Sequence, residues 1–153
     1  MGVSTDGVIC YGVYVEEDLP FDQEKHDDEE EWWRHHKGYK RPFEMFTEDG
    51  QWIGGEEWPE EKCDEYFEHQ REWDEANPMP FELVNVCSAD CPMWVIAVPT
   101  MKTTACRGYP VVIDQGTLST RGFSEEIERF REFLKEAFDI TEEPKWFLGS
   151  YWG

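Results

Sequence analysis

Two short apolar runs, FELVNV at residues 81–86 and MWVIAV at residues 93–98, stand on either side of the connection CSADCP. Each run has the length and the aromatic and β-branched content of a buried strand. A connection this short joins strands that run antiparallel. The sequence therefore predicts a β-hairpin in the core, with Cys87 and Cys91 bracketing its tight connection.

Further strands are expected at both ends of the chain. GVICYGVYV, residues 7–15, predicts a first strand with a central place in the sheet, and KWFLGSYWG, residues 145–153, predicts an aromatic last strand. A short hairpin is expected around Asp49-Gly50. With the helices described next, the sequence predicts one α+β domain over residues 1–153: an antiparallel or mixed sheet with about three helices.

Three segments have helical spacing. Residues 22–37 predict a helix anchored by Trp32 or Trp33, with Gly38 placed to end it. The second helix, residues 59–75, begins at Pro59 and ends before Asn77-Pro78, and the third begins at the cap Ser124. The apolar positions expected to face inward are Cys63, Tyr66, Phe67 and Trp73 on the second helix, and Ile127, Phe130, Phe133, Leu134, Ala137 and Phe138 on the third.

The net charge of the chain is extreme. The 35 acidic residues outnumber the 14 lysines and arginines, which gives a formal charge of -21, while an aromatic content of 16% supplies enough apolar surface for a folded core. A field of this sign repels nucleic acid and anionic lipid, and it attracts basic surfaces that otherwise hold phosphate. We therefore expect a protein partner with a basic nucleic-acid-binding surface, and no direct contact with nucleic acid or membrane.

The acidic residues are concentrated in two segments. Residues 16–31 contain ten acids and one lysine, and residues 56–75 contain ten acids and two basic residues. In the second segment the acids recur at steps of three and four, which places them in one stripe along a helix, opposite the aromatic side. The candidate partner-binding residues are Asp27, Asp28, Glu29, Glu30 and Glu31 in the first segment and Glu57, Glu61, Glu65, Glu68, Glu72 and Glu75 in the second.

A stripe of this kind has three interpretations. Neighbouring carboxylates about 5 to 6 Å apart resemble the phosphates of a nucleic-acid strand, and their repulsion costs a few tenths of a kcal/mol per pair. The first interpretation is therefore mimicry of nucleic acid. The second is a surface that confers solubility or tolerance of high salt, and the third is a surface that binds divalent ions.

Metal and catalytic motifs are sparse. Cys87 and Cys91 have the spacing of half a zinc site, but the other two ligands would have to come from isolated residues such as His69. His35 and His36 are adjacent and point about 100° apart on a helix, so they do not chelate one ion together. The sequence contains no Gly-rich phosphate loop, nucleophile elbow or HExxH motif. We expect no cofactor and no enzymatic activity.

The cysteines and the termini indicate a cellular setting. Five cysteines in apolar contexts favour reduced thiols over a disulfide framework. No apolar run approaches the roughly 18 residues of a membrane span, and MGVSTDGV lacks the features of a signal peptide. These observations predict a cytoplasmic protein.

Three stretches resemble one group of proteins. GVSTDGVICYG at the start, FELVNVCSADCPMWVIAVP in the middle and EPKWFLGSYWG at the end are similar to small acidic proteins encoded by tailed bacteriophages. The resemblance implies a host cytoplasm as the setting. It also favours a role like that of phage proteins that inhibit CRISPR effectors or restriction enzymes by occupying their nucleic-acid-binding surfaces.

The leading hypothesis is a non-enzymatic phage-type inhibitor that blocks a basic nucleic-acid-binding surface of a host defence protein through its acidic helices. One alternative is a small metal-binding enzyme or zinc-stabilised module that uses Cys87, Cys91 and His69. Another is a phage accessory or assembly protein that buries exposed aromatic side chains in an oligomer.

Overall fold

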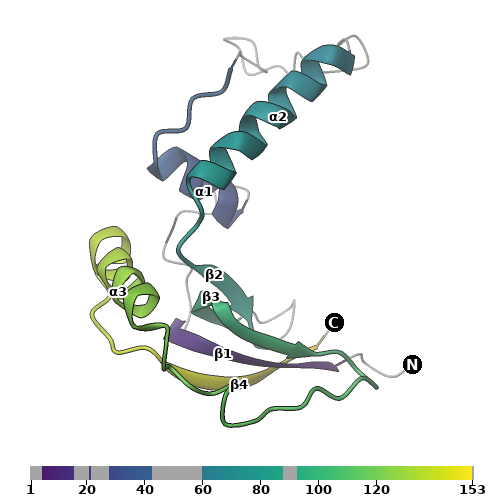
Figure 1. Ribbon diagram of the computed structural model, residues 1–153, viewed down its shortest axis with the longest axis vertical. Helices are drawn as coiled ribbons and strands as arrows, with labels where there is room; N and C mark the ends of the chain where they lie inside the picture. Colours follow the sequence, from purple (N-terminus) through teal and green to yellow (C-terminus); the bar gives the residue numbers. More distant parts are fainter. Residues whose placement is uncertain (1–4, 16–20, 22–27, 43–59, 88–92, 153) are drawn as a thin grey trace. The chain divides into compact units, whose positions relative to one another are not determined.

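The structure, a computed structural model, describes residues 5–15, 21, 28–42, 60–87 and 93–152 of the chain (Figure 1). The chain forms two compact units, one from residues 1–29 with 80–153 and one from residues 30–79. The α+β class is confirmed, with three helices and an antiparallel sheet. That residues 1–153 act as one domain stays a prediction. The hairpin expected around Asp49-Gly50 lies outside the described residues.

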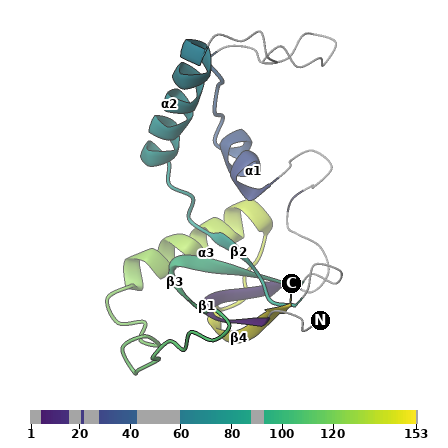
Figure 2. The ribbon, with the colours of Figure 1, turned by 90° about the vertical axis from the view of Figure 1, so that its right-hand side faces the viewer.

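The first unit is built on a four-stranded sheet in the order β2-β3-β1-β4, in which every neighbouring pair is antiparallel. The strands are β1 (Thr5–Val15), β2 (Glu82–Asn85), β3 (Trp94–Ala105) and β4 (Lys145–Trp152). Leu83 pairs with Ile96, so the hairpin predicted from the two apolar runs is confirmed. The central place predicted for the first strand is also confirmed, and β2 and β4 are the edges of the sheet (Figure 2).

Strand β3 is longer than the apolar run that predicts it. The run ends at Val98, but the strand continues past Pro99 to Ala105. Gly12 pairs with Ala97 whereas Cys10 pairs with Lys102, so residues 98–101 lie opposite Tyr11 alone. Proline has no N–H to donate and is tolerated inside a sheet where the ladder is interrupted in this way. The irregular register explains why the predicted end of the strand is wrong.

Gly12 stands at this irregularity, where the two backbones come very close. A Cβ atom at position 12 would lie 2.0 Å from the carbonyl oxygen of Ile96 and 2.7 Å from the Cα atom of Ala97. Neither backbone atom belongs to a side chain that can rotate away. The close approach of β1 and β3 therefore requires glycine here.

Helix α3 (Ser124–Phe138) lies across one face of the sheet (Figures 1 and 2). It buries Ile127, Phe130 and Leu134. Its half-buried Phe133 stacks on Phe81 with ring centroids 5.0 Å apart. The other face of the sheet has its own buried cluster of Val8, Cys10, Val84, Val95 and Ala97. The sheet thus has apolar side chains packed on both faces.

The start of α3 differs from its prediction. Ser124 was expected as the cap, but it is the first helical residue, and Phe123 occupies the cap position without a side-chain hydrogen bond. The reason is that the carbonyl of Phe123 accepts the first intrahelical bond, from the N–H of Ile127 at 2.9 Å. Glu125 and Glu126 lie in the first turn, where negative charge suits the helix dipole.

The second unit is a pair of helices, α1 (Glu29–His36) and α2 (Glu60–Ala76). Within the described residues α1 begins at Glu29, and Asp28 precedes it as a bend. Gly38 ends α1 as predicted, with a φ of 73°. Its N–H donates to the carbonyl of His35 and the N–H of Tyr39 donates to that of Arg34, which satisfies two carbonyls of the last turn. None of the described helices is both long and apolar enough to cross a membrane.

Candidate functional site

The inner side of α2 is held against α1 by aromatic side chains. Trp33 is buried, and its Nε1 donates to the carbonyl of Asn77 at 2.9 Å. Tyr39 meets Trp73 edge-on with centroids 5.2 Å apart, and its hydroxyl lies 3.2 Å from Nδ1 of His69. The expectation that Trp32 or Trp33 anchors the first acidic helix is thereby confirmed for Trp33. These contacts fix the rotation of α2 about its axis.

Arg34 adds an ionic link between the helices. Its Nε and Nη2 donate to the two carboxylate oxygens of Asp74 at 2.9 and 2.8 Å, and Nη2 also reaches Glu30 at 2.9 Å. The amide of Gln70, in the orientation that satisfies both its ends, accepts from the same guanidinium at 3.0 and 3.1 Å. The hydrogen bonds that Arg34 donates to Asp74 raise the pKa of Arg34 above its ordinary value.

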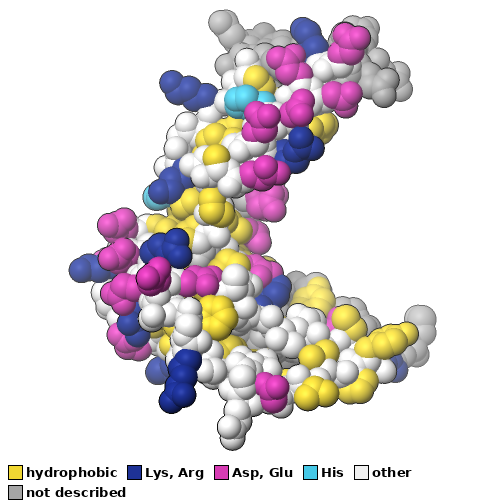
Figure 3. All heavy atoms as spheres, viewed as in Figure 1, with side chains coloured by type: hydrophobic (Ala, Val, Ile, Leu, Met, Phe, Trp, Pro, Cys, Tyr) yellow, Lys and Arg dark blue, Asp and Glu magenta, His cyan; other side chains and the backbone are white. Residues whose placement is uncertain are grey.

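The predicted stripe is present on the outer side of α2. All five of its described members lie on the helix and are exposed: Glu61, Glu65, Glu68, Glu72 and Glu75. Figure 3 shows acidic side chains along this helix. Among described residues, only Glu68 of the five has an ion-pair partner, Arg71 at 3.3 Å, and both side chains of that pair are exposed. The sixth predicted member, Glu57, lies outside the described residues.

The acids of the first segment are arranged differently. Glu30 pairs with Arg34, and Glu31 lies 3.5 Å from Arg41. Part of the charge on α1 is therefore balanced within the unit. Asp28 and Glu29 stand at the start of the helix, and Asp27 lies outside the described residues. Among the described candidate residues, the exposed carboxylates without an ion-pair partner are therefore mostly those of α2.

The prediction that Phe67 faces the inner side of α2 is wrong. It was expected to face inward, but it is 63% exposed and meets Tyr66 edge-on at 5.6 Å. The half-buried and buried positions of α2 share one side of the helix and leave out residue 67: Cys63, Tyr66, His69, Gln70, Trp73, Asp74 and the following Asn77. The polar Gln70 and Asn77 hid this spacing, because an apolar pattern alone favours Phe67 over them.

The residues considered as zinc ligands have other contacts. Cys87 is half-buried, and its N–H donates to Oδ1 of Asn85 at 3.1 Å. His69 belongs to the helical unit and is engaged with Tyr39. Cys91 lies outside the described residues. In the described ranges no group of three or more His, Cys, Asp or Glu side chains could hold a metal ion, and the four described cysteines are free thiols.

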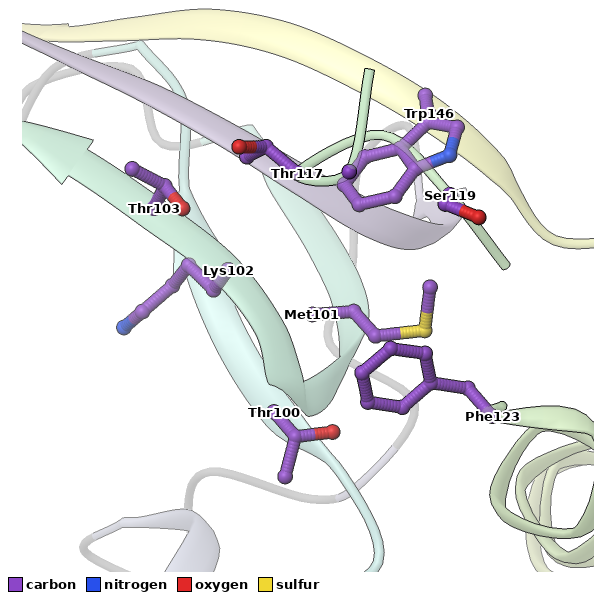
Figure 4. Close-up of a pocket in the computed structure, with 9 residues that line it drawn as sticks. Thr100, Met101, Lys102, Thr103, Thr117, Ser119, Phe123 and Trp146 are labelled. Carbon is purple, nitrogen blue, oxygen red and sulfur yellow. The ribbon is translucent and has the colours of Figure 1, made fainter. Parts of the chain in front are cut away.

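A pocket of about 190 Å³ lies in the sheet-bearing unit, between β3, the start of β4 and the loop before α3. Figure 4 shows Met101, Phe123 and Trp146 pointing toward one another inside it, whereas the amino group of Lys102 points away. Lys102 forms an ion pair with Glu82, and the hydroxyl of Thr100 bonds to Glu126. The lining thus offers hydroxyl groups and apolar surface, and its one charged side chain is already paired.

The comparisons with known proteins gave no match: no family model fits the chain, and neither a curated protein nor a solved structure is similar to it.

Proposed function

We propose that this protein is a non-enzymatic inhibitor of the phage type, which occupies a basic nucleic-acid-binding surface of a host protein through the acidic outer side of α2. The observation that carries the proposal is the line of exposed carboxylates Glu61, Glu65, Glu68, Glu72 and Glu75 on one side of a single helix. Four of these five have no ion-pair partner among described residues.

The way in which α2 is held supports a role in presentation. Asp74 lies at the inner edge of the helix and is bonded to Arg34, Trp73 meets Tyr39 just after α1, and Tyr66 is buried. Contacts to α1 thus use one side of the helix, and the carboxylates stand on the other. A rigid row of charge loses less conformational entropy on binding than a flexible acidic tail does.

The spacing of the row supports the choice of partner. Residues three or four apart on a helix have Cβ atoms about 5 to 6 Å apart, which is close to the spacing of successive phosphates along a nucleic-acid strand. Lysine and arginine side chains that neutralise phosphate would meet carboxylates at a similar pitch. We further propose that the inhibitor acts in a host cytoplasm, the setting implied by the resemblance of three sequence stretches to small acidic phage proteins.

The test is affinity capture from bacterial lysate with the full chain, followed by release of the captured proteins with duplex DNA or RNA. Proteins that bind through a nucleic-acid surface should be released by the nucleic acid and also by rising salt, because exposed charge pairs are screened beyond about 8 to 10 Å near physiological ionic strength. Captured proteins that resist both treatments would contradict the proposal.

A matched pair of variants makes the test specific. Glu65→Lys/Glu72→Lys reverses two charges in the stripe, and Glu132→Lys/Glu136→Lys makes the same change in net charge at exposed positions of α3. The first variant should lose capture because like charges then face each other. The second should retain it. Equal loss in both would show that net charge, and not the stripe, determines binding.

A further inference from the structure

The connection between β3 and α3, residues 106–123, is an ordered loop held at several points. The N–H of Tyr109 donates to the carbonyl of Cys106 at 2.9 Å, and Gly108 between them has a φ of 81°. The N–H of Arg107 donates to Oδ1 of Asp6 at 3.0 Å, which fixes the loop to β1. Asp114 accepts from the N–H of Thr117 at 2.9 Å. The loop is therefore held by its own hydrogen bonds, and its apolar side chains are not buried.

Those apolar side chains are exposed. Val112 is 86%, Tyr109 77%, Val111 44% and Ile113 43% exposed. On β4, Leu148 is 80% exposed, and it lies on the same face of the sheet as Trp146, which meets Thr117 and Ser119 of the loop in the pocket of Figure 4. Figure 3 shows hydrophobic side chains gathered over the end of β3 and the loop that follows it. We call Tyr109, Val111, Val112, Ile113 and Leu148 the apolar patch.

The backbone of the patch is also open. Residues 109–114 run between two turns without a turn, bend, helix or strand of their own. Within the described part of the chain, the peptide groups of Val111, Val112 and Ile113 form no hydrogen bond. Three consecutive β-branched residues with unpaired N–H and C=O groups are suited to pair with another strand.

The patch differs in charge from the rest of the chain. Residues 106–123 contain Arg107, Arg121 and a single acid, Asp114, and the only charged residue of β4 is Lys145. Two molecules that each carry a formal charge of -21 repel one another over most of their surfaces. This surface is one on which two copies can approach without placing carboxylates against carboxylates.

We propose that the apolar patch binds the same patch on a second copy of this chain, in a two-fold arrangement. The 109–113 segments would run antiparallel about Val111, so that the two Val111 residues exchange N–H and C=O bonds and the N–H of each Ile113 donates to the carbonyl of Tyr109 in the other copy. A two-fold contact of this kind is closed, so it gives a dimer and not a fibre. The side chains of Val112 and Tyr109 would be removed from water in both copies, which is the driving force.

The first test measures the mass of the full chain by sedimentation over a range of protein concentrations at low and high sodium chloride. The dimer fraction should rise with concentration and also with salt, because salt screens the repulsion between the acidic copies. This salt dependence is opposite in sign to that expected for binding through the acidic stripe, so the two proposals can fail separately. A single monomer mass under all these conditions would overturn the dimer.

The second test uses matched variants. Val112→Asp adds an acid within the patch, so that a dimer would bring two new carboxylates into one apolar contact, and it should weaken dimerisation by about tenfold or more. Phe67→Asp makes the same kind of change on α2, at a position that is not part of the patch, and should leave dimerisation unchanged. Both positions are exposed, so both variants should fold. Equal weakening by the two variants would contradict the assignment of the dimer surface to the patch.

Amide hydrogen exchange on the unmodified chain gives an independent measurement. The amides of Val111 and Ile113 should exchange fast in dilute protein and at least about tenfold more slowly at concentrations where the dimer is populated. Exchange in α2 should not depend on concentration. Concentration-independent exchange at both Val111 and Ile113 in a sample that contains dimer would place the interface elsewhere.

Discussion

Arg34 of α1 donates two parallel hydrogen bonds to the carboxylate of Asp74 of α2, with Nε 2.9 Å from Oδ1 and Nη2 2.8 Å from Oδ2. The Arg34 side chain is only 15% exposed. A guanidinium matches a carboxylate in this geometry in a way that a single ammonium group does not. The pair sets the position of α2 relative to α1, and with it the direction in which the carboxylates of α2 face.

The first prediction concerns this pair. Arg34→Ala should destabilise the helical unit by about 2 kcal/mol, because it removes a bidentate ion pair and leaves the Asp74 carboxylate without its partner. Arg34→Lys should restore only part of that loss. Amide exchange of α1 and α2 measures both effects locally.

Arg71→Ala is the matched control for that prediction. The Arg71 ion pair with Glu68 is 3.3 Å long and both side chains are about two-thirds exposed. Its loss should change stability by no more than about 0.5 kcal/mol. If Arg34→Ala and Arg71→Ala had the same small effect, the Arg34–Asp74 pair would not be what joins the helices.

The second prediction concerns glycines in β1. Gly12→Ala should cost about 3 kcal/mol or more, because its Cβ would overlap the backbone of Ile96 and Ala97. Gly7→Ala, in the same strand, should cost about 1 kcal/mol or less, since the nearest atom to its Cβ is the Cβ of Ala105 at 4.0 Å. Thermal unfolding of the two variants compares them directly. Similar unfolding temperatures would mean that β1 and β3 separate at Gly12 at little cost.

Local patterns in the sequence were sufficient for most of the fold. The apolar runs that became β2 and the first half of β3, and the spacing of Ile127, Phe130 and Leu134 in α3, depend on contacts that repeat every two or every three to four residues. Gly38 was recognised because the end of a helix favours a residue with positive φ. These features are encoded near the residues that adopt them.

Features that depend on distant residues were not predicted. The continuation of β3 past Pro99 follows from a register shift against β1, which is far away in the sequence. Phe67 is exposed because the polar Gln70 and Asn77, and not Phe67, lie on the half-buried side of α2. The acidic stripe itself was predicted, because it depends only on helical spacing.

The third prediction concerns the thiols. Burial raises the pKa of the Cys10 thiol to about 11, with Lys102 lowering it and Glu82 raising it further. At pH 8 the reactive thiolate of Cys10 should therefore be about 100-fold scarcer than that of an ordinary cysteine. Alkylation followed by peptide mass analysis should label the exposed Cys106 before the buried Cys10, and in urea the difference should vanish. Rapid labelling of Cys10 in the native protein would show that the sheet opens easily.

The last prediction separates a binding role of the stripe from a structural one. Glu72 has Glu68 four residues before it and Glu75 three residues after it, so it repels a neighbour on each side. Glu72→Lys replaces two repulsions by two attractions and places a positive charge near the C-terminal end of α2, where it suits the helix dipole. The variant should therefore be more stable than the native protein by about 0.5 to 1 kcal/mol.

Glu132→Lys on α3 is the control, because its helical neighbours Glu128, Arg129, Lys135 and Glu136 are balanced in charge, and its effect should be close to zero. Amide exchange of each helix, recorded at increasing urea concentrations, measures the stability change of both variants. A gain at Glu72 combined with loss of partner capture would mean that the native glutamate is kept for binding at the expense of stability. A loss of stability at Glu72 would show that the carboxylate has a structural partner, and the stripe would then lose its standing as a binding surface.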